Sequence, residues 1–283
     1  MISIAVMLAV IVLVAALLSW MLWPASPSPE MRVLLKGRKY AHRGMFDNKA
    51  GVPENSLAAF GVARDMGYGI ELDIHLTSDG EVVVFHDDTL ARMCGDALKV
   101  EALSLAELKA LSLLSTQHKI PALRELLSLV DGGAPLLIEF KTGLPGSADV
   151  RPLCEAASRL LDGYKGDYLV ESFDANVLSW FRNNRPKVMR GQLALGFETY
   201  ERALGKECAA SIPLIRRRML SWLLYNYTSR PHFISYRFED AGLPLRICKK
   251  LGAMAAAWTV RTPEDSVRLL AKYDSIIFEG FKA

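Results

Sequence analysis

The octapeptide Gly69-Ile70-Glu71-Leu72-Asp73-Ile74-His75-Leu76 carries two patterns at once. Its polar and aliphatic residues alternate, so the period of two of a β-strand sends Glu71, Asp73 and His75 to one face and the aliphatic side chains to the other. Two carboxylates that converge on one spot repel each other and lose hydration, so they need a compensating cation. Hard carboxylate oxygens suit Mg²⁺ or Ca²⁺. The octapeptide therefore predicts a strand with an acidic metal site on one face.

A second apolar run, Leu137-Ile138-Glu139-Phe140-Lys141, repeats this pattern. Glu139 and Lys141 share a face, where Glu139 offers a third metal ligand and the Lys141 ammonium can bind a phosphate group. A single charged pair at a strand end is more often solvated and balanced by Lys or Arg. Two inward-facing charged patterns on separate strands favour the functional interpretation, with Glu71, Asp73 and Glu139 as the metal ligands.

Apolar runs of this kind alternate with helical stretches from about residue 39 onward, which is typical of βα units and a parallel sheet. They predict principal strands at residues 40–42, 69–76, 135–141, 168–173, 188–194, 232–237, 253–260 and 275–279, with an extra segment at 82–86. Eight strands in about 250 residues match the α/β class of the TIM (β/α)8 barrel, whose active sites lie at the carboxyl ends of the strands. A doubly wound open sheet shows the same alternation, but no Gly-rich phosphate loop follows the first strand.

Two histidines come at the ends of apolar runs, His42 in Tyr40-Ala41-His42-Arg43-Gly44 and His86 in Phe85-His86-Asp87. Such a histidine is more often structural, yet imidazole suits proton transfer near neutral pH, and the nearby carboxylates favour roles as acid and base. Arg43 offers planar, permanently charged donors to a phosphate oxygen, and Gly44 lets the backbone turn away from the strand.

Composition excludes two classes of protein. At 283 residues, 51% hydrophobic and 23% charged, the chain can bury a large core and is not a disordered scaffold. Its 34 Lys and Arg exceed its 31 Asp and Glu by only three, so charge alone gives no nucleic-acid surface, and we expect no nucleic-acid partner.

Residues 1–23 contain no charged side chain and would span roughly 34 Å as a helix, enough to cross a bilayer. A cleaved signal peptide is the alternative. No Lys or Arg precedes the run, however, and Ala25-Ser26-Pro27 is a poor cleavage site, so a single transmembrane anchor is favoured. Three prolines interleaved with serines predict an extended linker over residues 24–38, followed by the barrel at 39–283.

Basic residues follow the apolar span, whereas only the terminal amine precedes it. The four are Arg32, Lys36, Arg38 and Lys39. By the positive-inside rule they predict a single-pass membrane protein whose barrel is cytoplasmic.

A later stretch, residues 212–230, combines Arg216, Arg217 and Arg218 with Trp, Leu and Tyr and contains no acidic residue. Such a composition favours contact with a membrane surface, where lysophospholipids would be within reach. An ordinary barrel helix with its apolar face on the sheet is the alternative.

The blocks Ala41-His42-Arg43-Gly44, Pro53-Glu54-Asn55-Ser56, Glu71-x-Asp73 and Phe85-His86-Asp87 resemble, in order and spacing, the glycerophosphodiester phosphodiesterase family. The later blocks Ile120-Pro121-Ala122-Leu123, Ile138-Glu139-Phe140-Lys141, Glu171-Ser172-Phe173 and Trp258-Thr259-Val260 continue the likeness, which runs from about residue 39 to the carboxyl terminus.

The resemblance implies a TIM barrel that uses one divalent cation, Mg²⁺ or Ca²⁺, to hydrolyse a glycerophosphodiester into glycerol 3-phosphate and an alcohol. By the same resemblance Glu71, Asp73 and Glu139 hold the metal, His42 and His86 are the acid and base, and Arg43, Glu54 and Lys141 surround the phosphate and glycerol. The nucleophile is water or the glycerol hydroxyl; the sequence leaves both open.

Some residues depart from the family pattern. His75 replaces an uncharged residue, Arg261 replaces Asn, and Glu279 stands where the family has Asp, which leaves the role of Glu279 open. Trp258 suits either a stacking contact with the glycerol or a place in the core.

Three alternatives to the glycerophosphodiesterase remain. A lysophospholipase D would act on membrane lysophospholipids at the same site. A phosphatidylinositol-specific phospholipase would also use two histidines, but the acidic blocks disfavour it. A catalytically silent, lipid-binding barrel is the third alternative, since fold does not guarantee chemistry.

Overall fold

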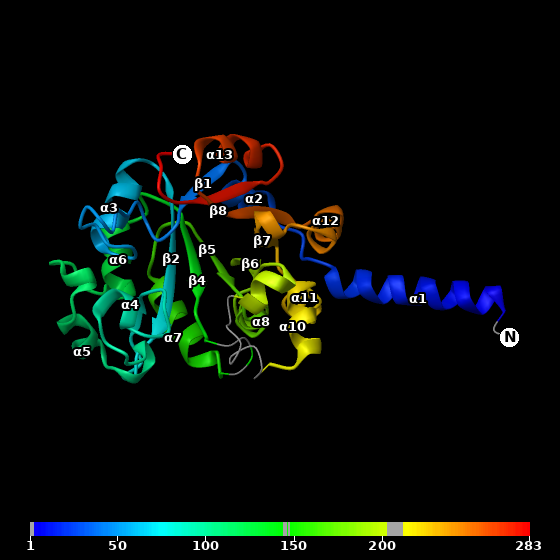
Figure 1. Ribbon diagram of the computed structural model, residues 1–283, viewed down its shortest axis with the longest axis horizontal. Coiled ribbons are helices and arrows are strands. Elements are labelled where there is room, and N and C mark those ends of the chain that lie inside the picture. The colour runs from blue at the N-terminus through cyan, green and yellow to red at the C-terminus, as the bar shows by residue number, and fades with distance from the viewer. Residues whose placement is uncertain (1–2, 144–145, 147, 203–211) are drawn as a thin grey trace.

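The computed structural model describes residues 3–143, 146, 148–202 and 212–283. In these residues a closed ring of parallel strands is wrapped by helices, and one long helix projects from its flank (Figure 1). The ring order is β1, β9, β8, β7, β6, β5, β4 and β2, and pairing of β1 with β2 closes it. The chain therefore has the TIM-barrel fold that the sequence predicts.

The ring strands are β1 (Arg38–Ala41), β2 (Gly69–Leu76), β4 (Leu136–Phe140), β5 (Tyr168–Ser172), β6 (Met189–Ala194), β7 (Phe233–Arg237), β8 (Met254–Val260) and β9 (Ser275–Phe278). The extra segment is β3 (Val82–Val84), which pairs antiparallel with β2 outside the ring. All of the predicted strands are confirmed, with ends that differ by at most about two residues.

The inside of the barrel has an apolar lower layer and a polar upper layer. Near the amino ends of the strands, Tyr40, Leu137 and Phe233 are buried in one apolar cluster. Gly191 makes room for this layer, because a Cβ there would lie 2.1 Å from the Phe233 ring. Toward the carboxyl ends the inward positions of β2 and β4 become charged, so the polar site stands on an apolar base.

The helices around the ring are α3 (Leu57–Asp65), α6 (Leu123–Val130), α7 (Arg151–Asp162), α8 (Ala175–Asn184), α10 (Leu214–Ser221), α11 (Asn226–Ser229), α12 (Leu243–Lys250) and α13 (Pro263–Leu270). A 3-10 turn, η3 (Phe238–Asp240), follows β7. A small lobe with its own apolar cluster lies between β3 and α6; it contains α4 (Ala91–Cys94), η1 (Val100–Ala102), α5 (Leu105–Ala110) and η2 (Leu113–Ser115).

The segment before β1 differs from the extended linker that we expect over residues 24–38. It contains a helix, α2 (Pro29–Leu35), whose first turn is capped by Ser28, and proline is favourable at that first position. Leu35 is fully buried against the lower layer of the barrel. The expectation was wrong over α2 because seven residues are too few to show a helical period, while the prolines give a strong signal for extended chain.

The projecting helix is α1 (Ile4–Leu22), which has 19 residues and no charged side chain. Its length and composition suffice to cross a membrane, and a signal sequence meets the same criteria. Met1 and Ile2 of the predicted anchor lie outside the described residues.

Candidate active site

The turn after β1 places the first group of site residues. Arg43 has a positive φ of 56°, and Gly44 follows with a φ of 83°. A Cβ at Gly44 would lie 2.8 Å from the carbonyl carbon of Ala59. Gly44 therefore allows the sharp turn that the sequence predicts, and the turn directs the Arg43 amide to Glu71 Oε2 at 2.9 Å.

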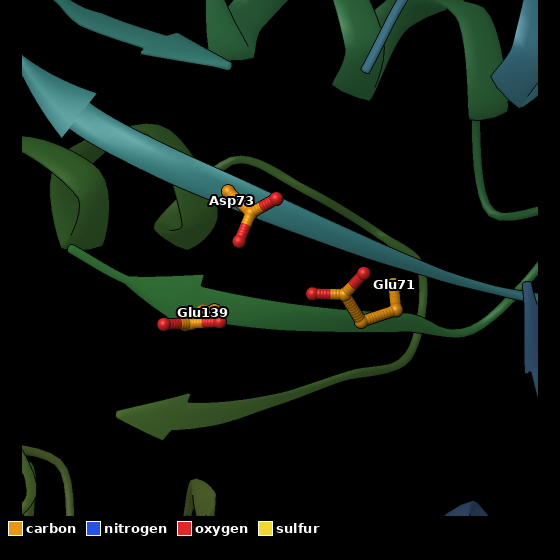
Figure 2. A group of neighbouring side chains, drawn as sticks. All are labelled: Glu71, Asp73 and Glu139. Carbon is orange, nitrogen blue, oxygen red and sulfur yellow. The ribbon is translucent and has the colours of Figure 1, made fainter. Parts of the chain in front are cut away.

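Three carboxylates meet inside the upper layer. Glu71 and Asp73 come from β2 and Glu139 from β4, and Figure 2 shows them facing a common space. One oxygen of each lies within 4.8 Å of the other two. All three are buried, and Asp73 is directly opposite Glu139 in the strand register. The predicted convergence of the three side chains is confirmed, while their role as metal ligands stays a prediction.

Two cations and one amide surround Asp73. Lys141 Nζ lies 2.7 Å from Glu139 Oε1 and 3.0 Å from Asp73 Oδ1. Arg43 Nε lies 3.5 Å from Asp73 Oδ2, which also accepts a hydrogen bond from Asn55 Nδ2 at 2.8 Å. Positive charge is therefore concentrated around Asp73 and does not extend equally to Glu71.

The pKa values of the carboxyl groups reflect this imbalance. Burial, followed by the charges of Asp73 and Glu139, raises the pKa of Glu71 well above its usual range. Burial raises the pKa of Glu139 to about 7, against the opposing effect of Lys141. Burial acts in the same direction on Asp73, but Lys141, His86 and Arg43 outweigh it and hold the pKa of Asp73 well below its usual range. The site thus has more carboxylate charge than its own cations offset.

The cluster fits a divalent cation. All of its donors are hard oxygens, which Mg²⁺ and Ca²⁺ prefer, and their spacing suits ligands of one ion. Among the described residues, Asp73 Oδ1 is paired with the Lys141 ammonium at 3.0 Å, which leaves one of its lone pairs for a further partner. A buried oxygen with unused acceptor capacity is what a metal ligand requires.

His42 is held by Glu279, the residue that follows the last strand of the ring. Its Nδ1 lies 2.6 Å from Glu279 Oε2, and its Nε2 lies 4.0 Å from Glu71 Oε2. Arg261 donates from Nε to the other Glu279 oxygen at 2.7 Å, so two residues that depart from the family pattern pair with each other. Burial lowers the pKa of His42, and the hydrogen bond to Glu279 opposes that shift.

His86 has a similar arrangement on the other side of the barrel mouth. Its Nδ1 lies 2.6 Å from Asp87 Oδ1, and Arg92 donates to Asp87 Oδ2 at 2.7 Å. Arg92 also binds Glu54 Oε1 at 2.7 Å, and Arg43 Nη1 binds the same oxygen at 2.7 Å. Burial, reinforced by the Lys141 charge, lowers the pKa of His86 to about 4. Glu54 therefore links the His86 side of the site to the turn that carries Arg43.

A cavity of about 340 Å³ lies at this mouth and is lined in part by His86, Glu139, Lys141 and Phe173. The partly buried Trp258 contacts Phe173 edge to face at 5.9 Å between ring centroids, and its Nε1 donates to the Ser235 carbonyl at 3.0 Å. Trp258 thus lies beside the cavity wall, which leaves its predicted contact with glycerol untested.

A second cavity, of about 850 Å³, adjoins the first through Lys141. His75 lines it, and its Nε2 lies 3.3 Å from the carbonyl oxygen of His86. Together the two cavities have room for a small phosphodiester and its alcohol group.

Several neighbours of the site received no role from the sequence. Asp87 and Asn55 could have been found, because each adjoins a singled-out residue, His86 or Glu54. Glu279 could have been placed beside His42 once ring closure made β9 the neighbour of β1. Arg92 gives no signal in the sequence, since it reaches Glu54 across 38 positions.

Comparison with known proteins identifies the same family that the sequence motifs resemble. The sequence model of the glycerophosphoryl diester phosphodiesterase family matches residues 42–278. A glycerophosphodiester phosphodiesterase of Caldanaerobacter subterraneus is 30% identical over 249 residues, which cover 84% of this chain and 91% of that protein. One from Bacillus subtilis is 28% identical over 207 residues, which cover 66% and 70% of the two chains.

Among solved structures, a phosphodiesterase from Oleispira antarctica in complex with the product sn-glycerol-3-phosphate is similar in fold. It has a TM-score of 0.67 and 21% identity, and the match covers 87% of this chain and 94% of that one.

Proposed function

The chain belongs to the glycerophosphoryl diester phosphodiesterase family and is a glycerophosphodiester phosphodiesterase; on this basis we propose that it hydrolyses glycerophosphodiesters to glycerol 3-phosphate and an alcohol with one divalent cation. The main support is the buried cluster of Glu71, Asp73 and Glu139. His42 lies at one edge of the cluster, and His86 lines the cavity at the other.

Glu71, Asp73 and Glu139 are the proposed ligands of the cation, and Mg²⁺ and Ca²⁺ both suit their oxygens. When bound, the cation would neutralise negative charge on the phosphoryl oxygens. Because the three carboxylates are buried, water does not compete with the cation for their oxygens.

Lys141 and Arg43 are the proposed phosphate-binding residues. The Lys141 ammonium lines the cavity, and its two carboxylate partners fix its position. The Arg43 guanidinium lies between Glu54 and Asp73, at 2.7 and 3.5 Å. Glu54 therefore acts by holding Arg43 at the turn, and we assign Trp258 to the wall that faces the glycerol.

His42 and His86 are the proposed base and acid. Each ring is held through Nδ1 by a carboxylate, which leaves Nε2 for the reacting groups. Burial lowers the pKa of both, so both are neutral at neutral pH before substrate binds, and a bound phosphate anion raises the pKa of the ring beside it.

Hydrolysis then needs one ring neutral and the other protonated. The neutral ring takes the proton of the attacking oxygen, water or the glycerol hydroxyl, as the new P–O bond forms. The protonated ring gives its proton to the alcohol oxygen, which keeps the electron pair of the P–O bond that breaks.

The experiment is release of glycerol 3-phosphate from glycerophosphocholine by the detergent-purified full chain, with and without EDTA and added Mg²⁺ or Ca²⁺. We expect metal-dependent release that is lost in His42→Ala, while a thermal melt shows that this variant is folded. Release by the wild type that persists after EDTA treatment, or in His42→Ala, would contradict the proposal.

Lysophospholipase D activity is the second candidate, because an apolar helix and an exposed apolar stripe on α10 adjoin the barrel. Formation of lysophosphatidic acid from lysophosphatidylcholine, with glycerophosphocholine as competitor, tests it. Lysophosphatidic acid formed without any release of glycerol 3-phosphate from glycerophosphocholine favours this candidate, and neither product favours a silent lipid-binding barrel.

We also propose that α1 anchors the protein in a membrane with the barrel in the cytoplasm, since the basic residues follow the helix. A reporter fused to the carboxyl terminus that is active only outside the cytoplasm would reverse this orientation.

A further inference from the structure

The carboxyl end of α1 is built into the barrel. Leu22 is only 2% exposed and belongs to an apolar cluster that includes residues of β7, β8 and α12. Arg230 donates from Nη1 to the carbonyl oxygens of Trp20 and Trp23 at 2.7 and 2.8 Å, and its guanidinium lies 5.2 Å from the centre of the Trp20 ring. Cleavage of a leader would remove all of these contacts. The carboxyl end of α1 therefore packs on the barrel, and we call this contact region the α1 joint.

Aromatic side chains gather at the α1 joint. Trp20 stacks on Tyr227 with 5.4 Å between ring centroids, and Tyr225 lies 6.5 Å from Tyr227. Trp20 and Trp23 remain about half exposed, at 52% and 51%. Trp and Tyr collect where the hydrocarbon of a bilayer meets water. The α1 joint thus has the composition of a segment at the membrane surface.

α10 presents an exposed stripe on the flank from which α1 projects (Figure 1). Ile215, Arg218 and Trp222 are spaced three and four residues apart, so they share one face of the helix. Ile215 is 68% exposed and Trp222 45%, and Leu214 beside them is 51% exposed. Arg217, on another face, pairs with Glu201. An apolar stripe interrupted by a cation is typical of helices that lie in a membrane interface.

The charge of this flank suits an anionic lipid surface. Residues 212–230 and 243–250, which include α10, α11 and α12, contain seven Lys and Arg and no Asp or Glu. α12 also contacts α1, where Cys248 Sγ donates to the Leu22 carbonyl at 3.5 Å. Basic side chains beside apolar ones bind anionic headgroups while the apolar groups enter the acyl boundary.

The chain path connects this flank to the active site. α10 comes after β6 in the chain, beyond residues 203–211 that the structure does not describe, and the segment after α11 enters β7 at its amino end. Since the active site is at the carboxyl ends of the strands, α10 runs along the side of the barrel from the mouth toward the base.

From these contacts we propose that the barrel lies on its side against an anionic leaflet, with Leu214, Ile215 and Trp222 at the boundary between headgroups and acyl chains and the α1 joint fixing this orientation. The proposal rests on α1 spanning the bilayer. The mouth then opens beside the headgroups, close to diesters that reside in the leaflet.

The test uses the full chain in vesicles of phosphatidylcholine with brominated chains, with or without phosphatidylglycerol. Bromine quenches a Trp only when the ring reaches the acyl boundary, and Trp222→Phe identifies the share of quenching that belongs to Trp222. Ile215→Glu puts a charge into the stripe. Val267→Glu is the matched control, because Val267 is 77% exposed on α13, away from α10 in Figure 1.

We expect Trp222 to be quenched, more strongly with phosphatidylglycerol present, and expect Ile215→Glu but not Val267→Glu to reduce the quenching. Unquenched Trp222 in protein that floats with the vesicles overturns the side-on orientation, and failure to float overturns the membrane anchor as well. Hydrolysis of soluble glycerophosphocholine by the same samples tests the proposed reaction independently, and Ile215→Glu should leave it unchanged.

Discussion

Replacing Glu279 by Gln tests whether His42 works through a charged partner. The His42 Nδ1 to Glu279 Oε2 distance is 2.6 Å, and the amide of Gln preserves the shape of the contact without its charge. The Glu279 side chain is 19% exposed, so part of the electrostatic effect is screened. We expect kcat to fall about 10- to 100-fold, or roughly 1.4–2.7 kcal/mol in the barrier, with little change in KM, since partners of this kind orient a reacting group.

The pH profile of the same variant identifies the role of His42. Glu279 opposes the lowering of the His42 pKa by burial, so its removal lowers that pKa further. The limb of the kcat/KM profile that His42 controls should move to lower pH: the acidic limb if His42 is the base, the basic limb if it is the acid. Glu155→Gln, at an exposed position on α7, is the control. An unchanged kcat with both limbs in place would refute the assigned role of Glu279.

Three further predictions concern the metal, the base of the barrel and acid stability. Asp73→Asn should weaken Mg²⁺ or Ca²⁺ binding in titration calorimetry by about tenfold or more, and equal binding would contradict the ligand assignment. Leu35→Ala should lower the free energy of unfolding by about 2–5 kcal/mol, as measured by denaturant titration, because Leu35 is fully buried. Val33→Ala, at an exposed position of α2, should lower it by less than about 0.5 kcal/mol. Burial and Arg190 lower the pKa of His232 to about 3; the unfolded chain therefore binds the extra proton first, and stability falls as pH drops from about 6.5 toward 3. In melting curves recorded at several pH values, His232→Gln should lose less stability than the wild type as the pH falls. An equal loss in both proteins would exclude His232 as its source.

The strands and the acidic cluster were predictable because both follow from local pattern. The period of two in residues 69–76 and 137–141 specifies which side chains share a face, and parallel strands align their carboxyl ends. Asp73 and Glu139 were therefore expected on one side of the sheet, and the register places them opposite each other. Local periodicity is sufficient wherever the site residues belong to neighbouring strands.

The partners of the histidines depend on contacts that periodicity does not encode. Glu279 reaches His42 across 237 positions, and its use follows only from closure of the ring. Arg92 comes from the small lobe, whose short helices have no regular pattern, yet it contacts both Asp87 and Glu54. A long side chain on an irregular segment can be assigned to a site only after the backbone is known.

The helix α2 inside the predicted linker has a consequence for how the barrel is attached to α1. A free proline-rich linker would let the barrel take any orientation beneath its anchor. The chain instead packs at three successive places: Leu22 in the α1 joint, Leu35 under the barrel and Tyr40 in the lower layer. The chain between α1 and β1 therefore packs on the barrel and is not a free linker. In the proposed orientation, with α1 in a bilayer, this packing would set the height of the barrel mouth above the membrane. We therefore expect the contacts of Arg230 with Trp20 and Trp23 to affect substrate access, although Arg230 is not among the proposed site residues.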